Sequence, residues 1–128
     1  MKRILLVDDE LELIEYFVGI LRRRLPEGGV VDLAVSGRQA FDMFKKNPYD
    51  VVVSDVRMPD GNGVMLLEQI FASFKKMPFF LFLTGYSDYP PKQLLGMGAA
   101  AVLEKPISLT QLWNKILENW QLHTSNIH

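Results

Sequence analysis

Acidic residues follow two of the apolar runs in this chain. They are Asp8, Asp9 and Glu10 after RILLV, and Asp55 after VVVS. A carboxylate at the end of a buried strand is costly unless a cation or a hydrogen-bond donor compensates it. Carboxylates in such positions can bind a hard metal ion or act as nucleophiles, and we expect their partners to follow the remaining apolar runs.

Two further apolar runs end on groups of other kinds. FFLFL is followed by Thr84, and AAVL is followed by Glu104, Lys105 and Pro106. If these runs are parallel strands, their carboxyl ends meet at one edge of a sheet, which is where such sheets bind ligands. We then expect at least three carboxylates, a hydroxyl and an ammonium group to converge.

Carboxylates that converge repel one another, by about 4 kcal/mol for two unit charges at ~4 Å and an effective dielectric constant of ~20. Their pKa values therefore rise, or a cation lies among them. A few oxygen ligands with room for water suit Mg²⁺ better than a Ca²⁺ cage. A phosphoryl group would find Mg²⁺, Lys105 and Thr84 arranged around it. With Asp55 as the nucleophile, the product would be an aspartyl phosphate.

Apolar periodicity predicts which elements hold these residues. We expect strands at 3–7, 30–35, 51–54, 79–83 and 100–103, and helices at 11–25, 37–46, 64–74, 91–97 and 108–122. Helix faces expected in the core contain Ile14, Phe17, Val18, Leu21, Leu25, Ala40, Phe41, Phe44, Leu67, Ile70, Phe71, Phe74, Leu109, Leu112 and Ile116. Strands that are apolar throughout, alternating with amphipathic helices, predict an α/β fold with a doubly wound parallel sheet covered on both faces.

Composition limits the possible functions. The chain has 128 residues, 14 basic and 15 acidic side chains, a net charge of -1 and no cysteine. This balance gives no reason to expect nucleic acid or an acidic membrane as a partner, and the lack of cysteine excludes disulfides and thiolate chemistry. No apolar stretch suits a signal peptide or a membrane span, so we expect a cytoplasmic protein. We expect one domain, residues 1–122, followed by a tail at 123–128.

The motifs VDDE, SDVRMPDGNG, FLTGYSD and VLEKP, in this order, resemble the receiver domain of two-component response regulators. The resemblance covers nearly the whole chain and implies a flavodoxin-like fold, with five strands in the order 2-1-3-4-5 and five helices. It implies a phosphoprotein that takes its phosphoryl group from a sensor histidine kinase or a phosphotransfer protein and passes the signal to an unknown output protein, and that is not a turnover enzyme.

The resemblance also assigns roles to particular residues. Asp55 is the expected phosphoacceptor, and Thr84 and Lys105 are expected to contact the phosphoryl group. Mg²⁺ is expected on Asp9 directly, on Asp8 mainly through water, on Asp55 and on the main-chain carbonyl of Arg57. The Lys105-Pro106 bond is expected to be cis.

Some positions depart from the family pattern. An aromatic residue often stands three positions before the lysine, but here the residue is Val102. Arg57 and Tyr86 are bulky and flank the site, so we expect slow hydrolysis of the phosphoryl group. Trp113, Leu117 and Trp120 widen the apolar arc of the last helix. They either cover the edge of their own domain or form an exposed patch for a partner or for a second copy of the chain, as in a homodimer.

Other functions remain open on the residues alone. A phosphatase with an aspartate nucleophile would resemble haloacid dehalogenases, which place a second acid where this chain has Arg57. A flavodoxin-like cofactor binder would need a phosphate loop free of the acids after the first strand. A degenerate receiver could act as a scaffold, and the chain could be a receiver fragment of a longer regulator or hybrid kinase.

Overall fold

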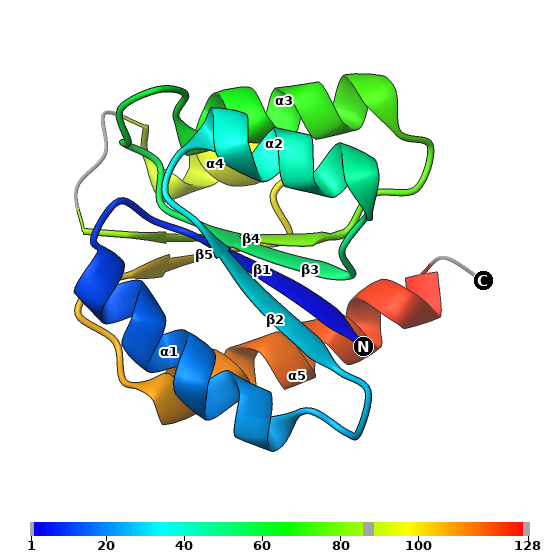
Figure 1. Ribbon diagram of the computed structural model, residues 1–128. Coiled ribbons are helices and arrows are strands. Elements are labelled where there is room, and N and C mark those ends of the chain that lie inside the picture. Colours follow the sequence, from blue (N-terminus) through cyan, green and yellow to red (C-terminus); the bar gives the residue numbers. More distant parts are fainter. Residues whose placement is uncertain (1, 86–88, 127–128) are drawn as a thin grey trace.

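The computed structural model describes residues 2–85 and 89–126, with side chains as far as Trp120. Five parallel strands form one sheet in the order β2-β1-β3-β4-β5 (Figure 1). The strands are β1 Arg3–Val7, β2 Val30–Ala34, β3 Val51–Ser54, β4 Phe79–Thr84 and β5 Ala101–Glu104. The helices are α1 Leu11–Arg24, α2 Gly37–Lys46, α3 Gly63–Ser73, α4 Pro91–Gly96 and α5 Leu109–Asn126. The predicted fold class and strand order are confirmed.

Helices cover both faces of the sheet, with α1 and α5 on one face and α2, α3 and α4 on the other (Figure 1). Alternate residues of each strand enter opposite cores, as the two-residue period of a strand requires. In β3, Val51 and Val53 pack with α1 and α5, whereas Val52 packs with α2, α3 and α4. Each face of the sheet therefore has its own apolar layer.

Most of the predicted core faces are buried, and two expectations need correction. Phe71 was placed on the apolar face of α3, but 66% of it is exposed, and Leu66 is buried in full instead. The last helix was expected to end at Leu122, but α5 continues to Asn126, so the tail expected from His123 begins as helix. Ser108 and Gln111 form a capping box at the start of α5, with reciprocal hydrogen bonds of 3.1 and 3.0 Å.

The two edges of the sheet differ in character. The carboxyl ends of the strands carry the acidic residues predicted to do chemistry. At the amino edge, the carboxylate of Asp50 accepts hydrogen bonds from the main-chain N–H groups of Lys2 and Arg3, at 2.8 and 2.9 Å. The far end of α5 lies toward this amino edge in Figure 1. Among the helices of the described residues, none has both the length and the apolar character needed to cross a membrane.

Candidate functional site

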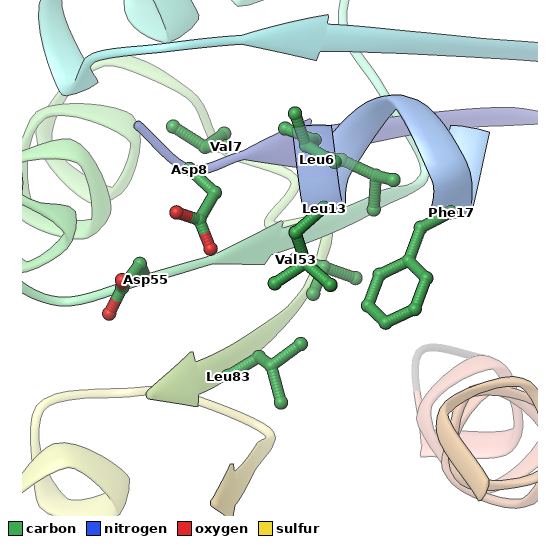
Figure 2. A pocket seen from close by; sticks show the side chains of 9 residues that line it. Leu6, Val7, Asp8, Leu13, Phe17, Val53, Asp55 and Leu83 are labelled. Carbon is green, nitrogen blue, oxygen red and sulfur yellow. The ribbon is translucent and has the colours of Figure 1, made fainter. Parts of the chain in front are cut away.

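Asp8 and Asp55 lie next to each other because their strands are neighbours in parallel register. Val7 pairs with Ser54, and the ladder continues as the Asp55 N–H donates to the Val7 carbonyl at 2.9 Å. Figure 2 shows the two carboxylates at the ends of β1 and β3. Asp9 joins them, and one carboxylate oxygen from each of the three residues lies within 4.8 Å of the others. The predicted convergence of these three acids is confirmed.

Lys105 brings the opposite charge to the same place. Its Nζ lies 2.7 Å from Asp8 Oδ2, 3.1 Å from Glu10 Oε1 and 3.2 Å from Asp55 Oδ2. Its backbone continues the sheet, because the Lys105 N–H donates to the Thr84 carbonyl at 2.9 Å. The Lys105-Pro106 bond is cis, as predicted. The lysine therefore enters the acidic cluster from β5, two strands away from β3.

An apolar cavity of about 20 Å³ lies beneath the two buried carboxylates. It is lined by Leu6, Val7, Asp8, Leu13, Ile14, Phe17, Val53, Asp55 and Leu83, most of which Figure 2 labels. Asp8 and Asp55 are only 7% and 8% exposed. Burial raises the pKa of Asp55 above its ordinary value; Lys105 lowers that pKa in part, and the charge of Asp8 raises it further. The site therefore favours an added positive charge.

The pKa of Lys105 is raised as well. Burial alone would lower it, but hydrogen bonds with Asp8 and Glu10, together with attraction to Asp8 and Asp55, outweigh burial. Lys105 is therefore a fixed cation at neutral pH. Together with the three clustered acids, it makes a site whose negative charge is only partly balanced.

Gly63 shows how closely the loop after β3 is packed beneath Asp55. A Cβ atom at Gly63 would lie 2.1 Å from the Asp55 carbonyl oxygen and 2.9 Å from both Phe82 Cε1 and Ser54 Oγ. The main-chain N–H of Gly63 also donates to the Val56 carbonyl at 2.8 Å. Only glycine fits this close approach, which holds the start of α3 against the candidate phosphoacceptor.

The remaining residues predicted for the site differ in their location and in their exposure to solvent. Thr84 ends β4 and is 7% exposed, on the same edge as the acids. The side chain of Arg57 is exposed, and the role predicted for its carbonyl stays a prediction. Tyr86 lies outside the described residues. The contact of Glu10 with Lys105 was not predicted, although the acidic run VDDE placed Glu10 near the edge.

The two tryptophans of α5 were expected either to cover their own domain or to form an exposed contact surface. Trp113 and Trp120 are half-buried and pack against the core cluster beneath α1 and α5. Leu117, between them, is 36% exposed. The indole rings thus cover part of their own domain, and a homodimer through this helix stays a prediction. Val102 is half-buried against the opposite core, on the face of the sheet that α2, α3 and α4 cover.

Comparison with known proteins agrees with this geometry. Residues 4–117 match the family described as the response regulator receiver domain. The chain therefore belongs to the receiver domains of two-component response regulators.

Three proteins show how similar the chain is to particular members of this family and to a sensor protein. It is 32% identical over 120 residues to the aerobic respiration control sensor protein ArcB of Escherichia coli K12, a match that covers 91% of this chain and 15% of ArcB. A CheY-like receiver domain protein from Methanospirillum hungatei JF-1 has a TM-score of 0.84 at 26% identity, with 98% of each chain covered. The response regulator TrrA of Thermotoga maritima, solved in complex with Mg²⁺ and BeF, has a TM-score of 0.77 at 32% identity, covering 93% of this chain and 99% of TrrA. The chain thus spans a small part of the sensor protein and nearly all of the isolated receivers.

Proposed function

We propose that this receiver accepts a phosphoryl group on Asp55 from a phosphohistidine of a sensor kinase or a phosphotransfer protein, and thereby changes its surface for an output partner. The observation that carries the proposal is the contact between Asp55 Oδ2 and Lys105 Nζ at 3.2 Å, inside a cluster of three acids. A lone phosphoacceptor would lack a cation for the transferred group. A degenerate scaffold would lack at least one of these groups.

The oxygen donors of the cluster fit Mg²⁺. Asp8, Asp9 and Asp55 offer carboxylate oxygens within 4.8 Å of one another, and the Arg57 carbonyl is the proposed main-chain ligand. When bound, Mg²⁺ would neutralise charge on the phosphoryl oxygens and on the acids. The assignment of Mg²⁺ is supported by TrrA, which is 32% identical to this chain and was solved in complex with Mg²⁺ and BeF.

Asp55 performs the nucleophilic step in this scheme. Its Oδ2 oxygen attacks phosphorus and forms a P–O bond as the P–N bond to the donor imidazole breaks. The imidazole leaves with the electron pair and then takes a proton from solvent. Lys105 donates hydrogen bonds to the phosphoryl oxygens, and the hydroxyl of Thr84 is proposed to do the same. Asp55 Oδ1 accepts a hydrogen bond from the Val56 N–H at 2.7 Å, so Oδ2, which Lys105 Nζ contacts at 3.2 Å, is the oxygen that reacts.

The test is intact mass after incubation with acetyl phosphate and Mg²⁺, followed by a phosphohistidine donor. We expect one phosphoryl adduct that needs Mg²⁺ and disappears in Asp55→Asn. Asp60→Asn is the matched control, because Asp60 lies in the same loop between β3 and α3 but is exposed. An adduct that persists in Asp55→Asn, or that forms equally without Mg²⁺, would refute the assignment, and so would the lack of an adduct with both donors.

Phosphoryl lifetime is a second part of the proposal. Arg57 is exposed two residues after Asp55, where a bulky side chain hinders the approach of water in line with phosphorus. We expect slow loss of the label, and faster loss in Arg57→Ala. Equal decay of the two proteins after the donor is removed would exclude shielding by Arg57.

A further inference from the structure

Glu10 uses its side chain in an unusual way for its position. It stands at the N-cap of α1, where a side-chain oxygen often accepts an N–H of the first helical turn, but its carboxylate makes no such bond. Instead, Glu10 Oε1 accepts a hydrogen bond from Lys105 Nζ at 3.1 Å. The backbone fixes this arrangement, because the Glu10 N–H donates to Asp8 Oδ1 at 2.9 Å. The side chain of Glu10 is therefore a partner of the active-site lysine.

The ammonium group of Lys105 has no donor to spare. A lysine ammonium has three N–H donors, and Lys105 makes three hydrogen bonds, to Asp8, Glu10 and Asp55. As Asp55 Oδ2 becomes the ester oxygen it releases one donor of Lys105, and the phosphoryl oxygens compete with Asp8 and Glu10 for the other two. For Lys105 to give the phosphoryl group a second hydrogen bond, Asp8 or Glu10 must give up its contact.

Burial identifies the carboxylate that gives way. The side chain of Asp8 is 11% exposed and makes the shortest contact with Lys105, at 2.7 Å, so its release would leave a buried charge unpaired. The side chain of Glu10 is 62% exposed, and water can replace the lysine at little cost. Glu10 is therefore the partner that Lys105 can exchange for a phosphoryl oxygen.

We propose that Glu10 is a positioning residue that holds Lys105 in the resting protein and competes with the incoming phosphoryl group for its ammonium. This inference rests on the proposed phosphorylation of Asp55. Removal of the Glu10 carboxylate frees a donor of Lys105 for the phosphoryl group. The variant should then be phosphorylated faster and bind a phosphoryl mimic more tightly, which a merely structural role would not produce.

The experiment compares Glu10→Ala and Glu10→Gln with Glu12→Gln. Glu12 is an exposed acid in the first turn of α1, so its variant matches the change in net charge. Initial rates with acetyl phosphate at saturating Mg²⁺ come from intact mass, and the affinity for beryllofluoride comes from ¹⁹F NMR. We expect Glu10→Ala to gain roughly two- to fivefold in both, the range for losing an exposed ion pair. Glu10→Gln should gain less, because its amide oxygen still accepts a hydrogen bond.

The outcomes separate this inference from the proposed function. Equal gains in Glu10→Ala and Glu12→Gln would indicate a general charge effect and overturn the role of Glu10, as would a loss of rate in Glu10→Ala. If wild type is phosphorylated on Asp55 but Glu10→Ala is unchanged, only this inference fails. If wild type neither takes up a phosphoryl group nor binds beryllofluoride, both fail.

Discussion

Replacement of Lys105 by methionine should show how much the stability of the acidic cluster depends on this cation. The side chains of Lys105, Asp8 and Asp55 are only 13%, 11% and 11% exposed. Removing one partner of a buried ion pair costs about 3–5 kcal/mol, because the remaining charge is left uncompensated. The exposed contact with Glu10 adds at most about 1 kcal/mol. Against a typical unfolding free energy of about 5–15 kcal/mol, we expect Lys105→Met to lose about 3–5 kcal/mol without Mg²⁺.

The loss of unfolding free energy in Lys105→Met should depend on pH, and the direction of this dependence follows from Asp55. The charge of Lys105 lowers the pKa of Asp55, so its removal moves that pKa further above the ordinary value. A group with a raised folded-state pKa binds its proton more tightly when folded, so its contribution to stability is present at low pH and lost as the pH rises through that pKa. The deficit of Lys105→Met should thus be largest well above the folded-state pKa of Asp55 and shrink as acid protonates this carboxyl.

Urea unfolding in EDTA, monitored by tryptophan fluorescence at about pH 8 and at about pH 5, would measure the difference in unfolding free energy between Lys105→Met and wild type. Lys92→Met is the matched control, because Lys92 is an exposed lysine on α4. Mg²⁺ should restore part of the loss in Lys105→Met, since a ligand that binds only the folded state stabilises it. If Lys105→Met is as stable as Lys92→Met in EDTA at the higher pH, the argument from buried charge is wrong.

Four other substitutions test the packing and the ionisable groups around the sheet. Gly63→Ala places a Cβ 2.1 Å from the Asp55 carbonyl oxygen, so we expect it to lose about 1–3 kcal/mol of unfolding free energy or more in urea titrations, the cost of overpacking. The pKa of Tyr49 is raised to about 12 by burial and by its hydrogen bond to a carboxylate. Its contribution to stability is present below pH 10.0 and lost as the pH rises through about 12, so Tyr49→Phe should be less sensitive to pH than wild type across that window. Phe44→Ala should lose about 3–5 kcal/mol, whereas Phe71→Ala should change the unfolding free energy by less than about 0.5 kcal/mol, and similar losses for both would contradict the burial of one and the exposure of the other.

Much of the site could be predicted because a parallel sheet converts sequence order into spatial position. Asp55 and Asp8 each follow an apolar run, and the carboxyl ends of neighbouring parallel strands must lie together. Lys105 follows the run that forms β5, so the same rule places it at this edge. These inferences needed only the type of each element and the residue after it.

Other features depend on side-chain packing that periodicity does not resolve. Helix α3, GVMLLEQIFAS, is apolar on more than one face, so the pattern could not decide between Leu66 and Phe71 for the core. The sheet buries Leu66 and leaves Phe71 in solvent. The contact of Glu10 with Lys105 joins residues 95 positions apart and depends on the direction of two long side chains. No spacing in the sequence indicates which acid of VDDE the lysine would reach.

The positions of Lys2 and of α5 have a practical consequence for measuring partner binding. The main-chain N–H of Lys2 donates a hydrogen bond to Asp50 at the amino edge of the sheet, and α5 extends toward that edge in Figure 1. Asp55 lies at the opposite edge, where the strands end. An affinity tag at either end should therefore attach the protein to a sensor surface with its acidic cluster facing the solution. A kinase or phosphotransfer domain flowed over that surface would meet the reactive edge directly, without the tag or its linker in the way.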